Sequence, residues 1–223
     1  MSNQDYKNAA LQALKGNWAQ AVLLALVYLA LVLFFAGPYY AWSFRAGEDA
    51  AVTAFPVWQY GLLFGGYILF LIPLSVGIVN AFLALLRTGD NNLTANSFRL
   101  GFSKGYLRNL AAMLLVCLFV FLWSLLLIVP GIIMGLAYSM VPYLIQDHPE
   151  MGVMEAIKTS RKMMKGHKFD LFYLQLSFIG WAFLCVLTLC IGYLWLFPYM
   201  EAALTAFYED VHGQYLQAAG DNA

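Results

Sequence analysis

Charged residues are scarce in this chain of 223 residues. Asp, Glu, Lys and Arg make up 11% of it, against about 25% in a soluble domain, while apolar residues make up 62%. The formal net charge is zero, so the composition is not that of a polyanion-binding protein. These values indicate one integral membrane domain over residues 1–223, with no room for a separate soluble domain.

Cysteines and catalytic motifs are also sparse. The three cysteines all lie inside apolar runs, where we expect no disulfide: Cys117, Cys185 and Cys190. His148, His167 and His212 lie far apart and do not form the His-Glu-x-x-His pattern of a membrane metalloprotease. The sequence has no Walker loop and no dinucleotide fingerprint. We therefore predict a non-enzymatic protein with no catalytic residues, no metal and no cofactor.

The basic residues that are present fall on one side of the apolar runs. Eleven of the twelve Lys and Arg residues belong to this set: Lys7, Lys15, Arg87, Arg99, Lys104, Arg108, Lys158, Arg161, Lys162, Lys165 and Lys168. Only Arg45 falls elsewhere, beside Glu48 and Asp49. Short basic loops stay in the cytoplasm. The pattern predicts a multi-pass protein of a bacterial inner membrane with both termini cytoplasmic.

A membrane-spanning helix needs about 20 mostly apolar residues. Six candidates follow along the chain: Trp18 to Ala36, a second within Val57 to Leu86, two from Asn109 to Gln146 that join at Pro130-Gly131, Phe169 to Leu189, and Tyr193 to Tyr208. The predicted fold is all-α, with about six transmembrane helices in three hairpins. We expect a cytoplasmic amphipathic helix before each hairpin.

The second candidate is longer than one crossing requires. Val57 to Leu86 would extend about 45 Å as one helix, against a hydrocarbon core of about 30 Å. Pro73 lies at its middle. Either the helix is long and kinked there, or Val57 to Tyr67 forms a separate helix.

Three segments end in Lys-Gly just before an apolar run, at Lys15, Lys104 and Lys165. Each following hairpin returns to an acid, at Asp90, Asp147 and Asp210 respectively. Glycine permits a sharp change of direction between a surface helix and a spanning helix. We interpret the pattern as three pseudo-repeats at approximately 2–90, 91–147 and 148–210. The alternative is chance recurrence of ordinary membrane-boundary chemistry.

The segment from Glu150 to Lys165 has apolar and basic residues at helical spacing. Its basic residues, together with the next lysine, are candidates for binding anionic lipid headgroups: Lys158, Arg161, Lys162, Lys165 and Lys168. Because membrane helices hold this segment at both ends, we expect lipid and not nucleic acid as its polyanion.

Glu201 lies midway along the sixth candidate span, where an ionised carboxylate is costly. Thr205 and Tyr208 follow it at helical spacing, and Asn80 and Ser139 are expected at nearly the same depth. The cluster is either a proton or cation site or a set of hydrogen bonds that holds helices together.

Two glycine pairs have the small-xxx-small spacing that lets helices approach closely, Gly61 with Gly65 and Gly131 with Gly135. Either helices of this chain pack there, or a second copy or another membrane protein does.

The stretch from Ala156 to Tyr208 resembles a bacterial family of membrane proteins known as domain of unknown function 975. The resemblance lies in these residues: Ser160, Met164-Lys165-Gly166, Leu176-Ser177-Phe178-Ile179-Gly180-Trp181, Leu187-Thr188, Ile191-Gly192, Pro198-Tyr199 and Phe207-Tyr208. Lys15-Gly16-Asn17-Trp18 is similar to the family's opening. Such proteins often have glycine where this chain has Cys190. The resemblance implies a polytopic membrane protein and supplies no activity, cofactor or substrate.

Two functions lead, and an intramembrane enzyme ranks third. The first is a non-enzymatic membrane scaffold, or a module that binds partners and lipids through its cytoplasmic helices. The alternative is a small transporter or permeation pathway that uses Glu201 and the proline breaks.

Overall fold

The computed structural model describes residues 1–46, 57–102 and 105–220, and this part of the chain is helical with no strand. The predicted all-α class is therefore confirmed. Lys104, Glu48 and Asp49 lie outside the described residues. By length and composition, five segments could cross a membrane: Trp18–Phe44, Val57–Thr88, Tyr106–Leu126, Ile128–Asp147 and Lys168–Leu187.

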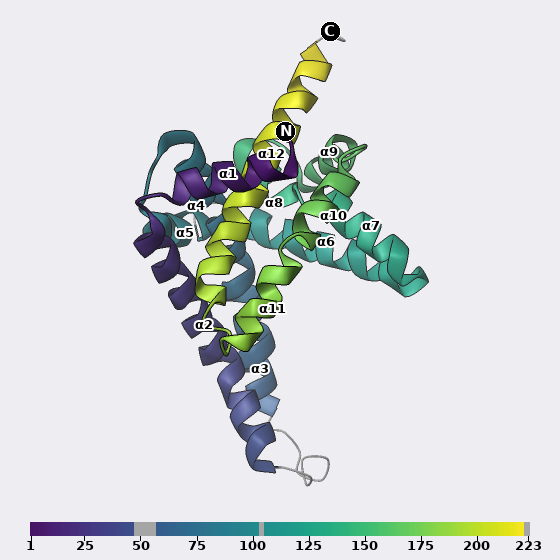
Figure 1. The fold of residues 1–223 in the computed structure, drawn as a ribbon. Helices are drawn as coiled ribbons and strands as arrows, with labels where there is room; N and C mark the ends of the chain where they lie inside the picture. The colour runs from purple at the N-terminus through teal and green to yellow at the C-terminus, as the bar shows by residue number, and fades with distance from the viewer. Residues whose placement is uncertain (47–56, 103–104, 221–223) are drawn as a thin grey trace.

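The first hairpin begins with a helix that is longer than predicted. We expected the span to end at Gly37-Pro38, but α2 runs from Trp18 to Ala46 with Pro38 inside it. The prediction of that boundary was wrong. Proline removes one backbone hydrogen bond, a loss that apolar spanning helices tolerate. The hairpin therefore extends as a long arm, which Figure 1 shows at the bottom of the molecule.

The return of this hairpin is one continuous helical path in three parts. These are α3 (Val57–Gly66), a π-helical turn (Tyr67–Leu71) and α4 (Ile72–Thr88). The structure thus favours the long helix over a separate one. Because Pro73 has no N–H, the carbonyl of Leu69 lacks its usual helical donor. The hydroxyl of Tyr106 donates to that carbonyl at 2.8 Å, so a side chain from the next hairpin satisfies it.

The second hairpin consists of α6 (Tyr106–Leu126), α7 (Ile128–Tyr138) and α8 (Val141–Asp147). The break falls at Leu127, which has extended backbone angles of φ −162° and ψ 147°. It lies three residues before the predicted Pro130. Pro130 instead occupies the first turn of α7, where its missing N–H would have no intrahelical partner anyway.

The third hairpin is α10 (Lys168–Leu176), α11 (Ile179–Leu187) and α12 (Tyr193–Gly220). The predicted fifth span is thus two helices that break at Ser177 and Phe178. The turn near Cys190 is as predicted. Cys190 itself has a φ of +65°, in the left-handed region that favours glycine. The third hairpin's last helix is not among the five candidate spans, and six crossings stay a prediction.

Three shorter helices precede the hairpins: α1 (Asn3–Leu14), α5 (Leu93–Gly101) and α9 (Val153–Met163). Each packs against a return helix of the preceding hairpin in a circular order: α5 on α4, α9 on α7 and α8, and α1 on α12. Each buries residues spaced by four: Tyr6, Ala10 and Leu14 on α1; Leu93, Ser97 and Gly101 on α5; and Ala156 and Ser160 on α9, followed by Met164 at its C-cap. Gly16 and Gly166 follow two of them at φ +87° and +98°, as a sharp turn requires.

The core lies where α4, α8 and α12 meet. Phe82, Leu144 and Phe207 are fully buried there, one on each helix. The rings of Tyr143 and Tyr208 stack with their centroids 4.6 Å apart. Figure 1 shows α12 rising through the middle of the molecule, with α1 and α9 at the end where both termini lie.

Candidate functional site

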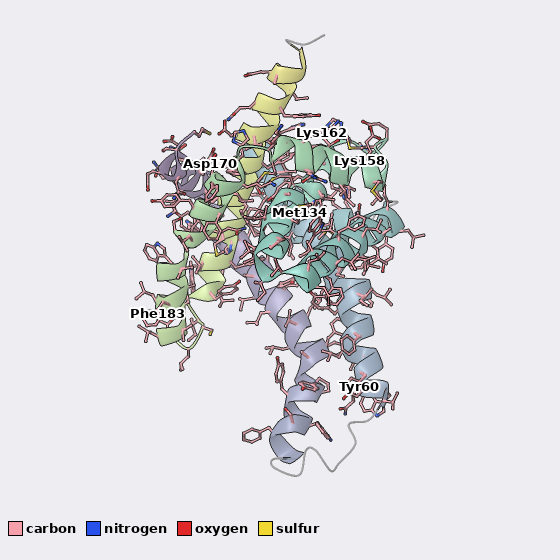
Figure 2. The ribbon with its side chains drawn as sticks, turned by 90° about the vertical axis from the view of Figure 1, so that its right-hand side faces the viewer. Tyr60, Met134, Lys158, Lys162, Asp170 and Phe183 are labelled. Atoms are coloured by element: carbon pink, nitrogen blue, oxygen red, sulfur yellow. The ribbon has the colours of Figure 1, made fainter. Side chains whose placement is uncertain are left out.

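A pocket lined by basic side chains lies on α9 and the start of α10. Its lining residues are the five predicted headgroup-binding candidates: Lys158, Arg161, Lys162, Lys165 and Lys168. None of the five forms a salt bridge with an acid in the described part of the chain. Figure 2 shows Lys158 and Lys162 on α9, at the opposite end of the molecule from Tyr60. The structure thus brings the predicted set together as one uncompensated basic pocket.

The position of α9 depends on contacts beneath its basic face. Ala156, Ile157 and Met163 are buried, and the fully buried hydroxyl of Ser160 donates to the carbonyl of Ala137 on α7 at 2.8 Å. Glu155 lies in the first turn, while basic residues lie in the last turn, an order that favours the helix dipole. A buried apolar face and a charged outer face therefore fix which side chains line the pocket.

An apolar groove adjoins the basic pocket. Its walls are α7 and α10, and its lining residues are Val129, Ile132, Ile133, Leu136, Lys165, Gly166, Lys168, Phe169 and Phe172. Lys165 and Lys168 line both spaces. The groove measures about 480 Å³. Its walls belong to candidate membrane spans, so apolar side chains and two lysines meet along one continuous surface.

Glu201 lies on α12 near three tyrosines, two from other helices and one from the start of α12. Tyr28 on α2, Tyr143 on α8 and Tyr193 at the start of α12 are all within electrostatic range of its carboxyl group. In the described residues no Lys, Arg or His forms a salt bridge with it. Glu201 lines neither the basic pocket nor the apolar groove.

The other predicted intramembrane polar residues bond mainly within their own helices. The amide of Asn80 donates to the carbonyl of Val76 at 2.7 Å, and the hydroxyl of Ser139 donates to that of Leu136 at 2.8 Å. Thr205 donates to the backbone carbonyl of Glu201 at 2.8 Å. Two of them also reach α8: the hydroxyl of Tyr208 donates to Asp147 at 2.6 Å, and the side chain of Thr205 hydrogen-bonds with Tyr143. Among these contacts, none joins Asn80 or Ser139 to Glu201.

The predicted packing glycines differ in their surroundings. Gly131 lies directly against Ser124 of α6, so any side chain there would collide with it. Gly61, Gly65 and Gly135 have nothing within 4 Å of the position that a Cβ would occupy. Two glycines that the sequence did not single out, Gly77 and Gly101, instead permit the close approach of α4 and α5.

A charged network that sequence reasoning missed joins the ends of α4 and α8 to the middle of α12. Arg87 donates to both carboxylate oxygens of Asp147 and to Glu209, each at 2.7 Å. Tyr208 donates to Asp147, and the ring of His212 stacks on that of Tyr208 with centroids 5.1 Å apart. The sequence did mark Asp147 as the acid that follows the second hairpin, but no sequence pattern indicated that Arg87 would be its partner.

Among the titratable groups beyond the predicted spans, His212 and Asp210 on α12 both have lowered pKa values. Burial lowers the pKa of His212, and the nearby carboxylate of Asp147 offsets only part of that shift. Burial acts to raise the pKa of Asp210, but hydrogen bonds, including one from Tyr6 at 2.6 Å, outweigh it and lower the pKa overall. Both shifts favour the native state at neutral pH over acidic pH.

Comparison with known proteins gives one match. Residues 125–215 match the family model described as protein of unknown function (DUF975). No curated protein and no solved structure matches the chain. The matched region includes the basic pocket, the apolar groove and Glu201, but not Lys15-Gly16-Asn17-Trp18, whose resemblance stays a prediction. Over residues 125–215 this match supports the resemblance to the DUF975 family that the sequence predicted.

Proposed function

We propose that this protein is a non-enzymatic module of a bacterial inner membrane that binds anionic lipid headgroups through α9 and the start of α10. The observation that carries the proposal is the basic pocket, in which five cations share one space with no ion pair to an acid among the described residues. Each basic residue near an anionic membrane surface contributes about 1 kcal/mol of attraction. Lipid held in this way would anchor the surface helices and organise partners on the cytoplasmic side.

The proposal depends on an orientation in which α9 faces the cytoplasm. The split of eleven basic residues against one supports this orientation, with both termini on the same side. It can be tested by replacing the three native cysteines with serine and introducing single cysteines by Arg161→Cys or Trp58→Cys. Labelling from the periplasm is expected at position 58 only. Labelling at position 161 would reverse the topology and remove the pocket from the cytoplasmic leaflet.

Lipid binding is tested with the whole protein in detergent. We expect phosphatidylglycerol to raise the melting temperature more than phosphatidylcholine does. The difference should shrink between about 0.1 M and about 1 M salt, because the Debye length falls from about 10 Å to about 3 Å. Neutralising Lys158, Arg161 and Lys162 to glutamine should remove the difference. Equal stabilisation by the two lipids at low salt would refute the proposal.

The matched control for those substitutions is Arg99→Gln together with Lys15→Gln. Both side chains are exposed, and neither lines the basic pocket. The control protein should keep the full difference between the two lipids. If the control loses it as well, the attraction comes from overall charge and not from the pocket.

A further inference from the structure

The basic pocket and the apolar groove are two parts of one surface. They share Lys165 and Lys168, which stand between the charged space on α9 and the apolar walls on α7 and α10. A free anion would use only the charged part, and an apolar ligand only the groove. A molecule with a charged end and an apolar end would occupy both.

The groove itself is open to the surroundings of the protein. Ile132 and Ile133 on α7 and Phe169 and Phe172 on α10 are all exposed. Both walls belong to segments that could cross a membrane. The size of the groove, about 480 Å³, falls within the range of about 300–1,000 Å³ typical of ligand sites. At this position the apolar material available to fill it is the acyl chain of a lipid.

The charge of the pocket restricts the headgroup. Five cations without a described acidic partner are more than one phosphodiester can neutralise, since such a group carries a single negative charge. Arg161 adds a planar fork that can hold two phosphate oxygens, whereas the lysines act as point charges. A headgroup with two phosphates complements this pocket better than one phosphate does, and basic pockets between spanning helices commonly bind such lipids.

The bend between α9 and α10 sets the geometry of the junction. Gly166 has a φ of +98°, which residues with a side chain rarely adopt. This turn places Lys165 at the end of one helix and Lys168 at the start of the next, so both reach the boundary between groove and pocket. The lysines are therefore held where the glycerol and phosphates of a lipid would lie.

We propose that the pocket and groove form a single site for one membrane phospholipid with two phosphates, its headgroup among the five cations and an acyl chain along α7 and α10. The inference rests on the proposed function and deepens it. Diffuse attraction to an anionic surface needs only the charges. A seated lipid needs the groove as well.

The experiment uses the whole protein purified in detergent and counts bound lipid by native mass spectrometry. The probes are cardiolipin with two phosphates, phosphatidylglycerol with one, and inorganic pyrophosphate with two phosphates and no chain. We expect one retained cardiolipin per protein, at least tenfold tighter than phosphatidylglycerol, and no comparable binding of pyrophosphate. Equal affinity for the two lipids, or for pyrophosphate and cardiolipin, would overturn the proposal.

Variants separate the two parts of the site. Lys165→Gln with Lys168→Gln should weaken cardiolipin binding at least tenfold. Ile132→Trp and, independently, Phe172→Trp fill the groove and should abolish retention while leaving the salt-dependent stabilisation by phosphatidylglycerol. Leu122→Trp on α6 lines neither space and is the matched control, with melting temperatures in the absence of lipid reporting on folding. If both groove variants fold and still retain cardiolipin, the proposal of a single lipid site is wrong, but the proposed function stands. If no lipid stabilises the wild type in a salt-dependent way, the proposed function itself is wrong.

Discussion

The guanidinium group of Arg87 holds both carboxylate oxygens of Asp147, each at 2.7 Å, although 60 residues separate them in the sequence. The pair connects the end of α4 to the end of α8. A third bond of Arg87, to Glu209, adds α12, which packs against α4. One side chain therefore links all three return helices.

Replacing Arg87 should test how much this link contributes. Arg87→Gln leaves the carboxylate of Asp147 without its cation, and we expect the free energy of unfolding in detergent to fall by about 1–2 kcal/mol. The exposed Arg99→Gln should change it by less than about 0.5 kcal/mol. Asp147→Asn should lower the free energy of unfolding by less in the Arg87→Gln protein than in the wild type. Strict additivity of the two substitutions would show that the pair is not coupled.

The stability of the fold should depend on the protonation of His212. Because its pKa is lowered in the folded protein, the native state disfavours the charged ring. Its contribution is complete above the unfolded pKa of about 6.5 and is lost as pH falls from there through the folded pKa. The melting temperature of the wild type should therefore drop over this window, and His212→Gln should flatten the drop.

We expect Asp210 to cause a second loss of stability at more acidic pH. Its folded pKa lies below the unfolded value of about 3.9, so its contribution is present above that value and is lost as pH falls through the folded pKa. Asp210→Asn should remove this step and leave the His212 step in place. A single transition that both substitutions move equally would contradict the assignment of separate groups.

The hydrogen bond from Ser160 to α7 should help to hold α9, and with it the basic pocket, in position. Ser160→Ala removes the donor to the carbonyl of Ala137 in a fully buried position, at an expected cost of about 1–2 kcal/mol. Ser177→Ala is the matched control, because that hydroxyl bonds within its own helix to the carbonyl of Leu174. Thermal unfolding in detergent measures both. If both variants lose the same stability, the hydrogen bond between α9 and α7 contributes no more than one within a single helix.

Glu201 distinguishes a module from a transporter. If the residue is structural, Glu201→Gln should stay folded and complement a deletion strain, while Glu201→Leu should cost about 1–3 kcal/mol through its tyrosine neighbours. If it is a proton or cation site, the glutamine variant should fold normally and fail to complement. A stable but inactive glutamine variant would favour the transporter.

Local patterns predicted the helices and the basic pocket well. The five cations of the pocket lie within eleven residues at helical spacing, so the sequence alone indicated that they would share a face. The contacts of Arg87 span 60 and 122 residues, and no periodic pattern marks such pairs. Local signals also failed where the surroundings override them. The helix continues through Pro38, and the break at Ser177 and Phe178 has neither glycine nor proline to mark it.

The circular packing of α1, α5 and α9 has a consequence for the order of folding. Helices α5 and α9 each pack against a hairpin that precedes them in the sequence. The contacts of these two helices can therefore form while the chain is still being synthesised. The first helix is different, because the stripe of Tyr6, Ala10 and Leu14 is covered by α12, which follows every other described helix in the sequence. The stripe on α1 must therefore stay exposed to chaperones or to the membrane surface until α12 has been synthesised and closes the circle.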